Sequence, residues 1–194
     1  MSTINSKSID GVFPPDQKKE IAKEPSAGTA PVLALGVGVL MACAGGGAMA
    51  GGKPLSVTEE VYVAAAPSKT WEKIKDFNGW QYWHPAFAGT AITKGGGNIK
   101  GTVRVLTTKD GAKFTEELVS YDTASRTYQY RIIESPLPIT DYVSTLEIKQ
   151  DKAGSTVVWS SNFQVKDGVS EKEMKDTISG VYRAGLDNLA SVVK

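Results

Sequence analysis

The sequence has very few of the residues that build metal and redox sites. Its 194 residues include one cysteine, Cys43, and one histidine, His84. A single chain therefore cannot assemble a zinc or iron site from Cys and His ligands, and it cannot form an internal disulfide. A phosphate-binding glycine loop is also missing, because Gly95 to Gly97 falls in an expected hairpin with no helix after it. We expect neither a metal nor a cofactor.

Charge of one sign is equally lacking. The chain carries 22 basic and 21 acidic residues, a net charge of +1. Proteins that hold nucleic acid through its phosphates need a basic surface, so we expect no nucleic-acid partner. The hydrophobic content of 41% is ordinary for a soluble globular protein, and the length suits one domain with an appendage. Nothing in the composition indicates an oligomeric state.

No apolar run reaches the roughly 20 residues that a membrane-spanning helix needs. The longest, from Ala30 to Ala44, has 15 residues. Residues 1–29 are polar, mix lysines with acids and include Pro14-Pro15, so we expect them to be disordered. Residues 30–53 complete the N-terminal appendage, and the folded domain covers residues 54–194.

The segment 30–53 has several interpretations. The small residues Ala48-Met49-Ala50 after the apolar run fit an export signal cleaved after Ala50, or the segment stays in place as a membrane anchor. Leu40 to Cys43 resembles a lipoprotein box with Cys43 as the lipid-bearing residue. The segment also suits a Gly/Ala-rich tether in a cytoplasmic protein. We expect an exported or membrane-associated protein rather than a cytoplasmic one.

From Pro54 the sequence shows the periodicities of regular structure. VTEEVYVAA predicts a first strand, and Pro67 opens a short helix that Asn78-Gly79 ends. Five later segments alternate with a period of two between turn residues, which predicts an antiparallel meander. The side chains predicted to face inward are Thr102, Arg104 and Leu106; Phe114, Glu116 and Leu118; Tyr128, Tyr130, Ile132 and Glu134; Tyr142, Ser144, Leu146 and Ile148; and Val157, Trp159, Ser161 and Phe163.

A long amphipathic helix is predicted over Ser170 to Val193, beginning with the capping box Ser170 to Glu173. Its apolar stripe needs a partner, and the concave surface of the sheet is the one available. We therefore expect an α+β fold in which a curved antiparallel sheet wraps around this helix and encloses a cavity. The stripe consists of Met174, Ile178, Val181, Tyr182, Leu186 and Leu189.

An aromatic segment, WEKIKDFNGWQYWHP from Trp71 to Pro85, lies between the first strand and the meander. Trp80, Tyr82 and Trp83 beside His84 and Pro85 suit the mouth of an apolar cavity, where a ring packs and its polar edge stays wet. We therefore expect the partner to be a small hydrophobic molecule.

Together these features resemble the polyketide cyclase/dehydrase and lipid-transport group of the START/Bet v 1-like superfamily, also called SRPBCC proteins. The resemblance covers roughly Leu55 to Lys194 and rests on the order of the elements, on DFNGWQYWHP, on ESPLPITDYVSTLEI and on VVWSSNF before the last helix. It implies the helix-grip fold. It does not imply one function, because that fold hosts carriers, receptors and enzymes.

Three shorter stretches, GTVRV, EELVSYD and TDYVSTLEI, are similar to the plant lachrymatory-factor synthases. The similarity places the catalytic Arg, Glu and Tyr of that family on Arg104, Glu116 and Tyr142. The sulfur substrate is not carried over, since the WHP segment and the loop Ser135 to Pro138 differ.

These three residues have two interpretations. In the first, Glu116 transfers a proton, Arg104 holds an oxyanion and Tyr142 donates a hydrogen bond or proton, which suits cofactor-free cyclase, dehydratase or isomerase chemistry. In the second, Arg104 and Glu116 form a structural ion pair, because a buried charge is costly unless it is paired.

Six further residues are candidates for ligand contact. His84 has a suitable intrinsic pKa for an acid or base at the cavity rim, but it also suits a capping or packing role beside Pro85, and the tyrosines suit the core. Besides an enzyme, the sequence fits a carrier whose polar trio recognises a carboxylate or carbonyl on a lipid, or a regulatory interaction module with a small cavity. The six candidates are Trp80, Trp83, His84, Tyr130, Glu134 and Tyr182.

Overall fold

The computed structural model describes residues 53–194. The expectations for residues 1–52, among them disorder of residues 1–29, cleavage after Ala50 and lipidation of Cys43, lie outside these residues. Within residues 53–194, no helix combines the length and the apolar character needed to cross a membrane.

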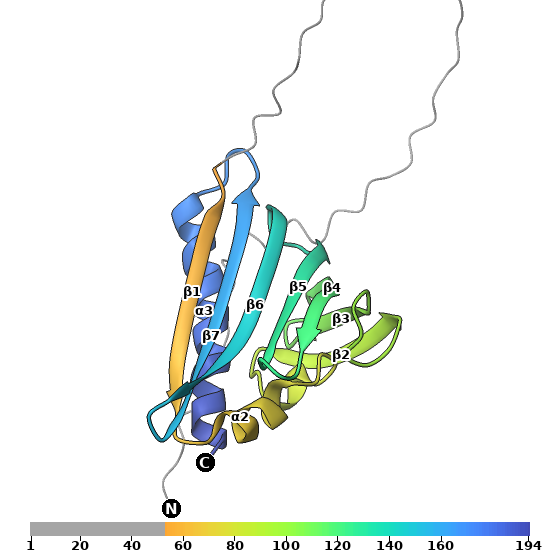
Figure 1. Ribbon diagram of the computed structural model, residues 1–194. Helices are drawn as coiled ribbons and strands as arrows, with labels where there is room; N and C mark the ends of the chain where they lie inside the picture. The colour runs from red at the N-terminus through yellow and green to blue at the C-terminus, as the bar shows by residue number, and fades with distance from the viewer. Residues whose placement is uncertain (1–52) are drawn as a thin grey trace, which may run out of the picture.

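Seven antiparallel strands form one curved sheet in the order β1-β7-β6-β5-β4-β3-β2 (Figure 1). Consecutive strands from β2 to β7 are neighbours, as a meander requires, and β1 adds to the edge beside β7. The strands are β1 Leu55–Val63, β2 Phe87–Lys94, β3 Val103–Thr108, β4 Lys113–Asp122, β5 Thr127–Glu134, β6 Ile139–Asp151 and β7 Gly154–Val165.

The strand β2 is the one that sequence alternation does not predict. Its sequence, FAGTAITK, contains Gly89, and its pairing with β3 shifts register at two places. Beyond Phe87 its residues are partly or fully exposed. An exposed edge strand with irregular register carries little of the apolar pattern by which strands are recognised.

Two short helical segments connect β1 to β2. The helix α2, Pro67–Ile74, has proline in its first turn and buries Trp71 and Ile74. It ends earlier than Asn78-Gly79, and Gly79 has a φ of −102°, so this pair does not supply the expected left-handed stop. The 3-10 turn η1, Trp80–Tyr82, follows and directs Trp80 into the interior.

The long helix α3, Glu171–Val192, lies along one face of the sheet beside β1 and β7 (Figure 1). Its N-terminus is capped as predicted, because the Ser170 hydroxyl accepts a hydrogen bond of 3.3 Å from the Glu173 N–H. The predicted apolar stripe is buried, apart from Val181, which is partly exposed.

The inward faces predicted from alternation are buried along β3, β4, β6 and β7. On β5, Tyr128 and Tyr130 are buried, Ile132 is partly buried, and Glu134 is exposed. The α+β helix-grip arrangement expected from the sequence is therefore confirmed, with one strand end that departs from the predicted parity.

Candidate functional site

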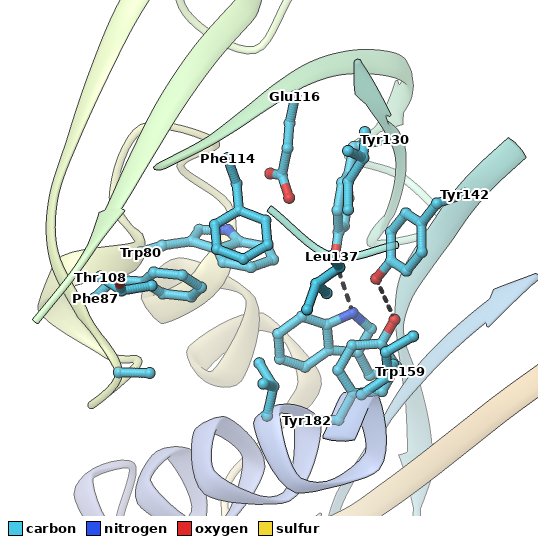
Figure 2. Close-up of a pocket in the computed structure, with 14 residues that line it drawn as sticks. Trp80, Phe87, Thr108, Phe114, Glu116, Tyr130, Leu137, Tyr142, Trp159 and Tyr182 are labelled. Carbon is cyan, nitrogen blue, oxygen red and sulfur yellow. Dashed lines mark hydrogen bonds between the residues drawn. The ribbon is translucent and has the colours of Figure 1, made fainter. Parts of the chain in front are cut away.

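A small cavity lies between the sheet and α3, with a volume of about 50 Å³. Figure 2 shows the residues that surround it. Aromatic and aliphatic side chains form most of the wall, including Trp80, Phe87, Phe114, Leu137 and Trp159. The polar part of the wall consists of Thr108, Glu116, Tyr130, Tyr142 and Tyr182. Five of the nine sequence candidates thus line one cavity: Trp80, Glu116, Tyr130, Tyr142 and Tyr182.

Glu116 brings a carboxylate to this cavity from the middle of β4. Its side chain points from the sheet toward the space between Trp80, Phe114 and Tyr130 (Figure 2). Only 4% of Glu116 is exposed to solvent. The cavity is therefore an apolar enclosure with a single carboxylate among its lining groups.

Arg104, directly opposite on β3, pairs with this carboxylate. Its Nε and Nη2 donate hydrogen bonds of 2.9 and 2.6 Å to Glu116 Oε2. Arg104 Nη1 donates to the Phe77 carbonyl oxygen. The guanidinium carbon also lies 3.9 Å from the ring centroids of both Phe77 and Trp80. These contacts fix the guanidinium on two sides and against two rings.

The position of Arg104 differs from the one that the catalytic interpretation needs. Arg104 is fully buried, and the described residues that line the cavity include Glu116 but not Arg104. Its charge is already shared between Glu116 and the Phe77 carbonyl. In this arrangement Arg104 holds Glu116 in place and does not itself line the cavity.

Burial and pairing act in opposite directions on Glu116. Burial raises the pKa of the Glu116 carboxyl, and the charge and hydrogen bonds of Arg104 oppose that rise without cancelling it. A raised carboxyl pKa lies closer to neutral pH, where a group both accepts and returns a proton efficiently.

Three tyrosines from different elements form a hydroxyl cluster beside Glu116. Tyr142 from β6 and Tyr182 from α3 share a hydrogen bond between their hydroxyls, drawn dashed in Figure 2. Tyr130 from β5 accepts a hydrogen bond of 3.1 Å from Trp159 Nε1. Burial raises the pKa of all three hydroxyls well above the usual value, so they stay protonated at neutral pH.

Ser144, a buried residue of β6, also belongs to this hydrogen-bonded cluster. The Ser144 hydroxyl donates to the Ser160 carbonyl oxygen at 2.8 Å, accepts from Trp159 Nε1 at 3.0 Å and lies 3.2 Å from the Tyr182 hydroxyl. Each hydroxyl has one proton, so the cluster satisfies much of its own hydrogen bonding within the wall.

His84 and Trp83 do not lie at the cavity mouth, contrary to expectation. Both are 1% exposed, and neither lines the cavity. Ala86 N–H donates to His84 Nδ1 at 3.2 Å, which leaves His84 Nε2 to donate to the Val181 carbonyl oxygen at 3.0 Å. Burial lowers the pKa of His84 to about 3. Both ring nitrogens are thus occupied and the imidazole is neutral, so the packing interpretation fits.

Glu134 is also misplaced by the sequence prediction. On β4, Thr115 pairs with Glu134 and Glu116 pairs with Ile132, so Ile133 has no partner in this ladder. One extra residue reverses the parity of everything beyond it, which turns Glu134 to the outer face with Thr115. The Thr115 hydroxyl donates to Glu134 Oε2 at 3.5 Å, and Glu134 does not line the cavity.

Sequence reasoning missed two residues that shape this region. Leu137, in the loop between β5 and β6, is buried and lines the cavity. Gly185 in α3 faces His84 so closely that an added Cβ would lie 2.7 Å from His84 Nε2 and 3.2 Å from Trp159 Cζ3. A glycine in the middle of a long amphipathic helix was the available signal for such a close approach.

Comparison with known proteins identifies the family. Residues 54–194 match the family model for polyketide cyclase / dehydrase and lipid transport. The chain belongs to this family. The match covers all but the first of the residues that the structure describes, 53–194.

Solved structures show the same fold. The XoxI protein of Bacillus cereus is 30% identical, with a TM-score of 0.66 over 71% of this chain and 94% of that one. A Thermobifida fusca protein is 28% identical, with a TM-score of 0.64 over 70% of this chain and 90% of that one. Ara h 8.0201, at 20% identity and a TM-score of 0.60 over 73% and 98% of the two chains, shows the likeness of fold alone.

No curated protein matches the chain. The comparisons support the family and the Bet v 1-like fold, whereas the similarity to lachrymatory-factor synthases stays a prediction from the sequence.

Proposed function

We propose that this protein binds a small hydrophobic molecule in the cavity and that Glu116 exchanges a proton with it. The observation that carries the proposal is the division of the Arg104–Glu116 pair: the carboxylate lines the cavity and the guanidinium lies behind it. A purely structural ion pair has no need to present one partner to an apolar space. Family membership and the apolar wall support the ligand class.

In the enzyme version, Glu116 accepts a proton from an acidic carbon or hydroxyl of the ligand and returns it at another position. Arg104 holds the carboxylate in place and compensates its charge, which makes it a positioning residue. Tyr142 and Tyr182 bring hydroxyls to the same cavity wall, where a developing oxyanion would be stabilised. Isomerisation consists of such proton transfers alone. In dehydration the removal of the carbon proton is coupled to cleavage of a C–O bond, with the returned proton leaving in water, and in aldol cyclisation the carbanion forms a C–C bond to a carbonyl carbon whose oxygen takes up the proton; none of the three needs a cofactor.

A carrier without chemistry is the second candidate, and the tyrosine cluster favours it. The hydroxyls of Tyr142 and Tyr182 already bond each other, and Ser144 and Trp159 bond the rest of the cluster. Because these polar groups hydrogen-bond one another, the wall can bind an apolar surface without taking part in a reaction. In this version Glu116 accepts one hydrogen bond from the ligand and keeps its proton state.

Proton exchange separates the two versions. The full-length protein is purified from its source cells, and its bound molecule is identified by native and then denaturing mass spectrometry. That molecule is incubated in D₂O with the wild type and with Glu116→Gln, and the incorporation of deuterium at carbon is followed. We expect exchange to fall by about 10²- to 10⁴-fold in Glu116→Gln, with the dissociation constant changed by less than about threefold.

Glu117→Gln is the matched control, because Glu117 is the next residue on β4, faces outward and pairs with Arg131. It should exchange deuterium at the wild-type rate. Undiminished exchange in Glu116→Gln would contradict the proton-transfer role and leave the carrier. Equal loss of binding and exchange would reduce Glu116 to a binding group.

A further inference from the structure

The pairing of β5 with β6 stops before either strand reaches the loop between them. The last paired residues are Arg131 and Val143, although β5 continues to Glu134 and β6 begins at Ile139. Over this stretch β5 remains paired with β4, and β6 with β7. The sheet therefore has an unpaired seam at the upper ends of β5 and β6 in Figure 1.

A hollow of about 420 Å³ lies at this seam. Residues from both unpaired strand ends and from the loop line it. Ile132, Leu137 and Tyr142 line both this outer hollow and the inner cavity. The two spaces thus share a partition made of side chains rather than backbone, and side chains move far more readily.

Leu137 is the part of this partition that comes from the loop. Its carbonyl oxygen accepts a hydrogen bond of 2.8 Å from the Ile139 N–H, and the neighbouring Pro138 carbonyl accepts one of 3.0 Å from the Lys166 N–H. These bonds anchor the loop backbone to β6 and to the end of β7. The backbone at Leu137 is therefore held in place, and its side chain lies between the two spaces.

The outer hollow differs from the cavity in its chemistry. Its polar wall contains two carboxylates, from Glu134 and Asp141, one ammonium, from Lys166, and the hydroxyls of Ser135 and Thr140. None of the ion pairs found among residues 53–194 uses the three charged groups. The hollow therefore has excess negative charge and several hydrogen-bonding groups, which disfavours an anionic occupant.

We propose that the cavity and the outer hollow form one bipartite site, entered between β5 and β6, for an amphipathic small molecule. Its compact apolar end lies in the cavity, its neutral or cationic polar end lies in the hollow, and Leu137 sets the size of the part that passes. This proposal rests on the proposed function. It also accounts for a cavity of about 50 Å³, which is too small by itself for the usual ligand site of roughly 300–1,000 Å³.

Three probes with one apolar body test the polar end: 2-phenoxyethanol, choline phenyl ether and phenoxyacetate. Their binding to the full-length protein is measured by calorimetry at low salt. We expect choline phenyl ether to bind about two- to fivefold more tightly than phenoxyacetate. In Glu134→Gln/Asp141→Asn this preference should fall below about 1.5-fold.

The partition is tested by the rate of binding. Leu137→Ala should speed the association of 2-phenoxyethanol at least about threefold in stopped-flow tryptophan fluorescence. Ile148→Ala is the matched control, because Ile148 is a buried aliphatic residue of β6 that lines neither space. It should leave the association rate as in the wild type.

The outcomes separate the two proposals. Val181→Phe fills the cavity, so loss of probe binding in this variant shows that the probes bind there. If the wild type then binds all three probes with equal affinity and Leu137→Ala has no effect on the association rate, the bipartite site is overturned and the cavity remains as a ligand site. If none of the three probes binds the wild type, the proposed function is overturned and the bipartite site with it.

Discussion

Glu116 and His84 are both buried ionisable residues, yet their surroundings differ in a way that separates a candidate site from a packed core. His84 uses both ring nitrogens on backbone groups, at Ala86 and Val181, and rings and α3 surround it. One carboxylate oxygen of Glu116 accepts two hydrogen bonds from Arg104, and the side chain lines a cavity. Burial is common to the two, so burial alone does not indicate function.

The comparison extends to what balances each polar group. Neutralisation suffices for His84, because its lowered pKa keeps it uncharged and two hydrogen bonds then satisfy it. Glu116 instead relies on a second charge, and that charge needs its own support from the Phe77 carbonyl and the rings of Phe77 and Trp80. Two hydrogen bonds to the backbone thus satisfy the buried histidine, whereas the buried carboxylate is stabilised by Arg104 and by the groups that hold Arg104.

Removing the support of Glu116 should have the largest effect. Arg104→Met leaves the carboxylate buried without a partner, so we expect the free energy of unfolding to fall by about 3–5 kcal/mol at pH 7 in urea denaturation. Arg131→Met is the control. Arg131 pairs with Glu117 at 2.7 Å on the exposed face of the same sheet, and its loss should cost less than about 1 kcal/mol. Equal costs for the two variants would contradict the special role of the buried pair.

The close packing around His84 gives the next effect. Gly185→Ala places a methyl group within 2.7 Å of His84 Nε2, so it should destabilise the protein by about 1–3 kcal/mol, although alanine is the better helix former. Gly180→Ala, in the same helix at a position where an added Cβ would meet no other part of the protein within 4 Å, should stabilise it by about 0.5–1 kcal/mol. Thermal denaturation of both variants measures the difference. A stabilised Gly185→Ala would show that the His84 region is loosely packed.

Much of this comparison was available from the sequence. Alternation with period two predicts that Glu116, Tyr130 and Tyr142 face inward, because a strand with one buried face allows little freedom of register. The capping box at Ser170 predicts the start of α3 for an equally local reason. Local rules therefore predict the fold and the inner side of the candidate site.

The remaining features depend on contacts between distant segments. The bulge that turns Glu134 outward arises from pairing with β4 and leaves no mark in the alternation of β5 itself. The difference between a rim and a core position for His84 depends on Gly185, about a hundred residues later, approaching its ring. The seam between β5 and β6 likewise arises because the end of β5 pairs with β4 and the start of β6 pairs with β7.

Lowering the pH should change the contributions of His84 and Glu116 to folding stability in opposite directions. The pKa of His84 falls from 6.5 to about 3 on folding, so the unfolded chain binds a proton there that the folded protein refuses. Stability should therefore fall by about 2 kcal/mol from pH 7 to pH 5 on account of His84. The raised pKa of the Glu116 carboxyl has the opposite effect on stability. The folded protein keeps this proton to a higher pH than the unfolded chain does, so the stabilisation from Glu116 declines as pH rises above the ordinary pKa of 4.5.

Two variants test these pH dependences by urea denaturation across pH 4–8. His84→Gln, which keeps a donor for the Val181 carbonyl, should lose the fall in stability toward acid pH, and Glu116→Gln should lose the decline toward higher pH. A His84→Gln variant with the pH dependence of the wild type would mean that folding leaves the pKa of His84 unchanged, and the contrast with Glu116 would then disappear.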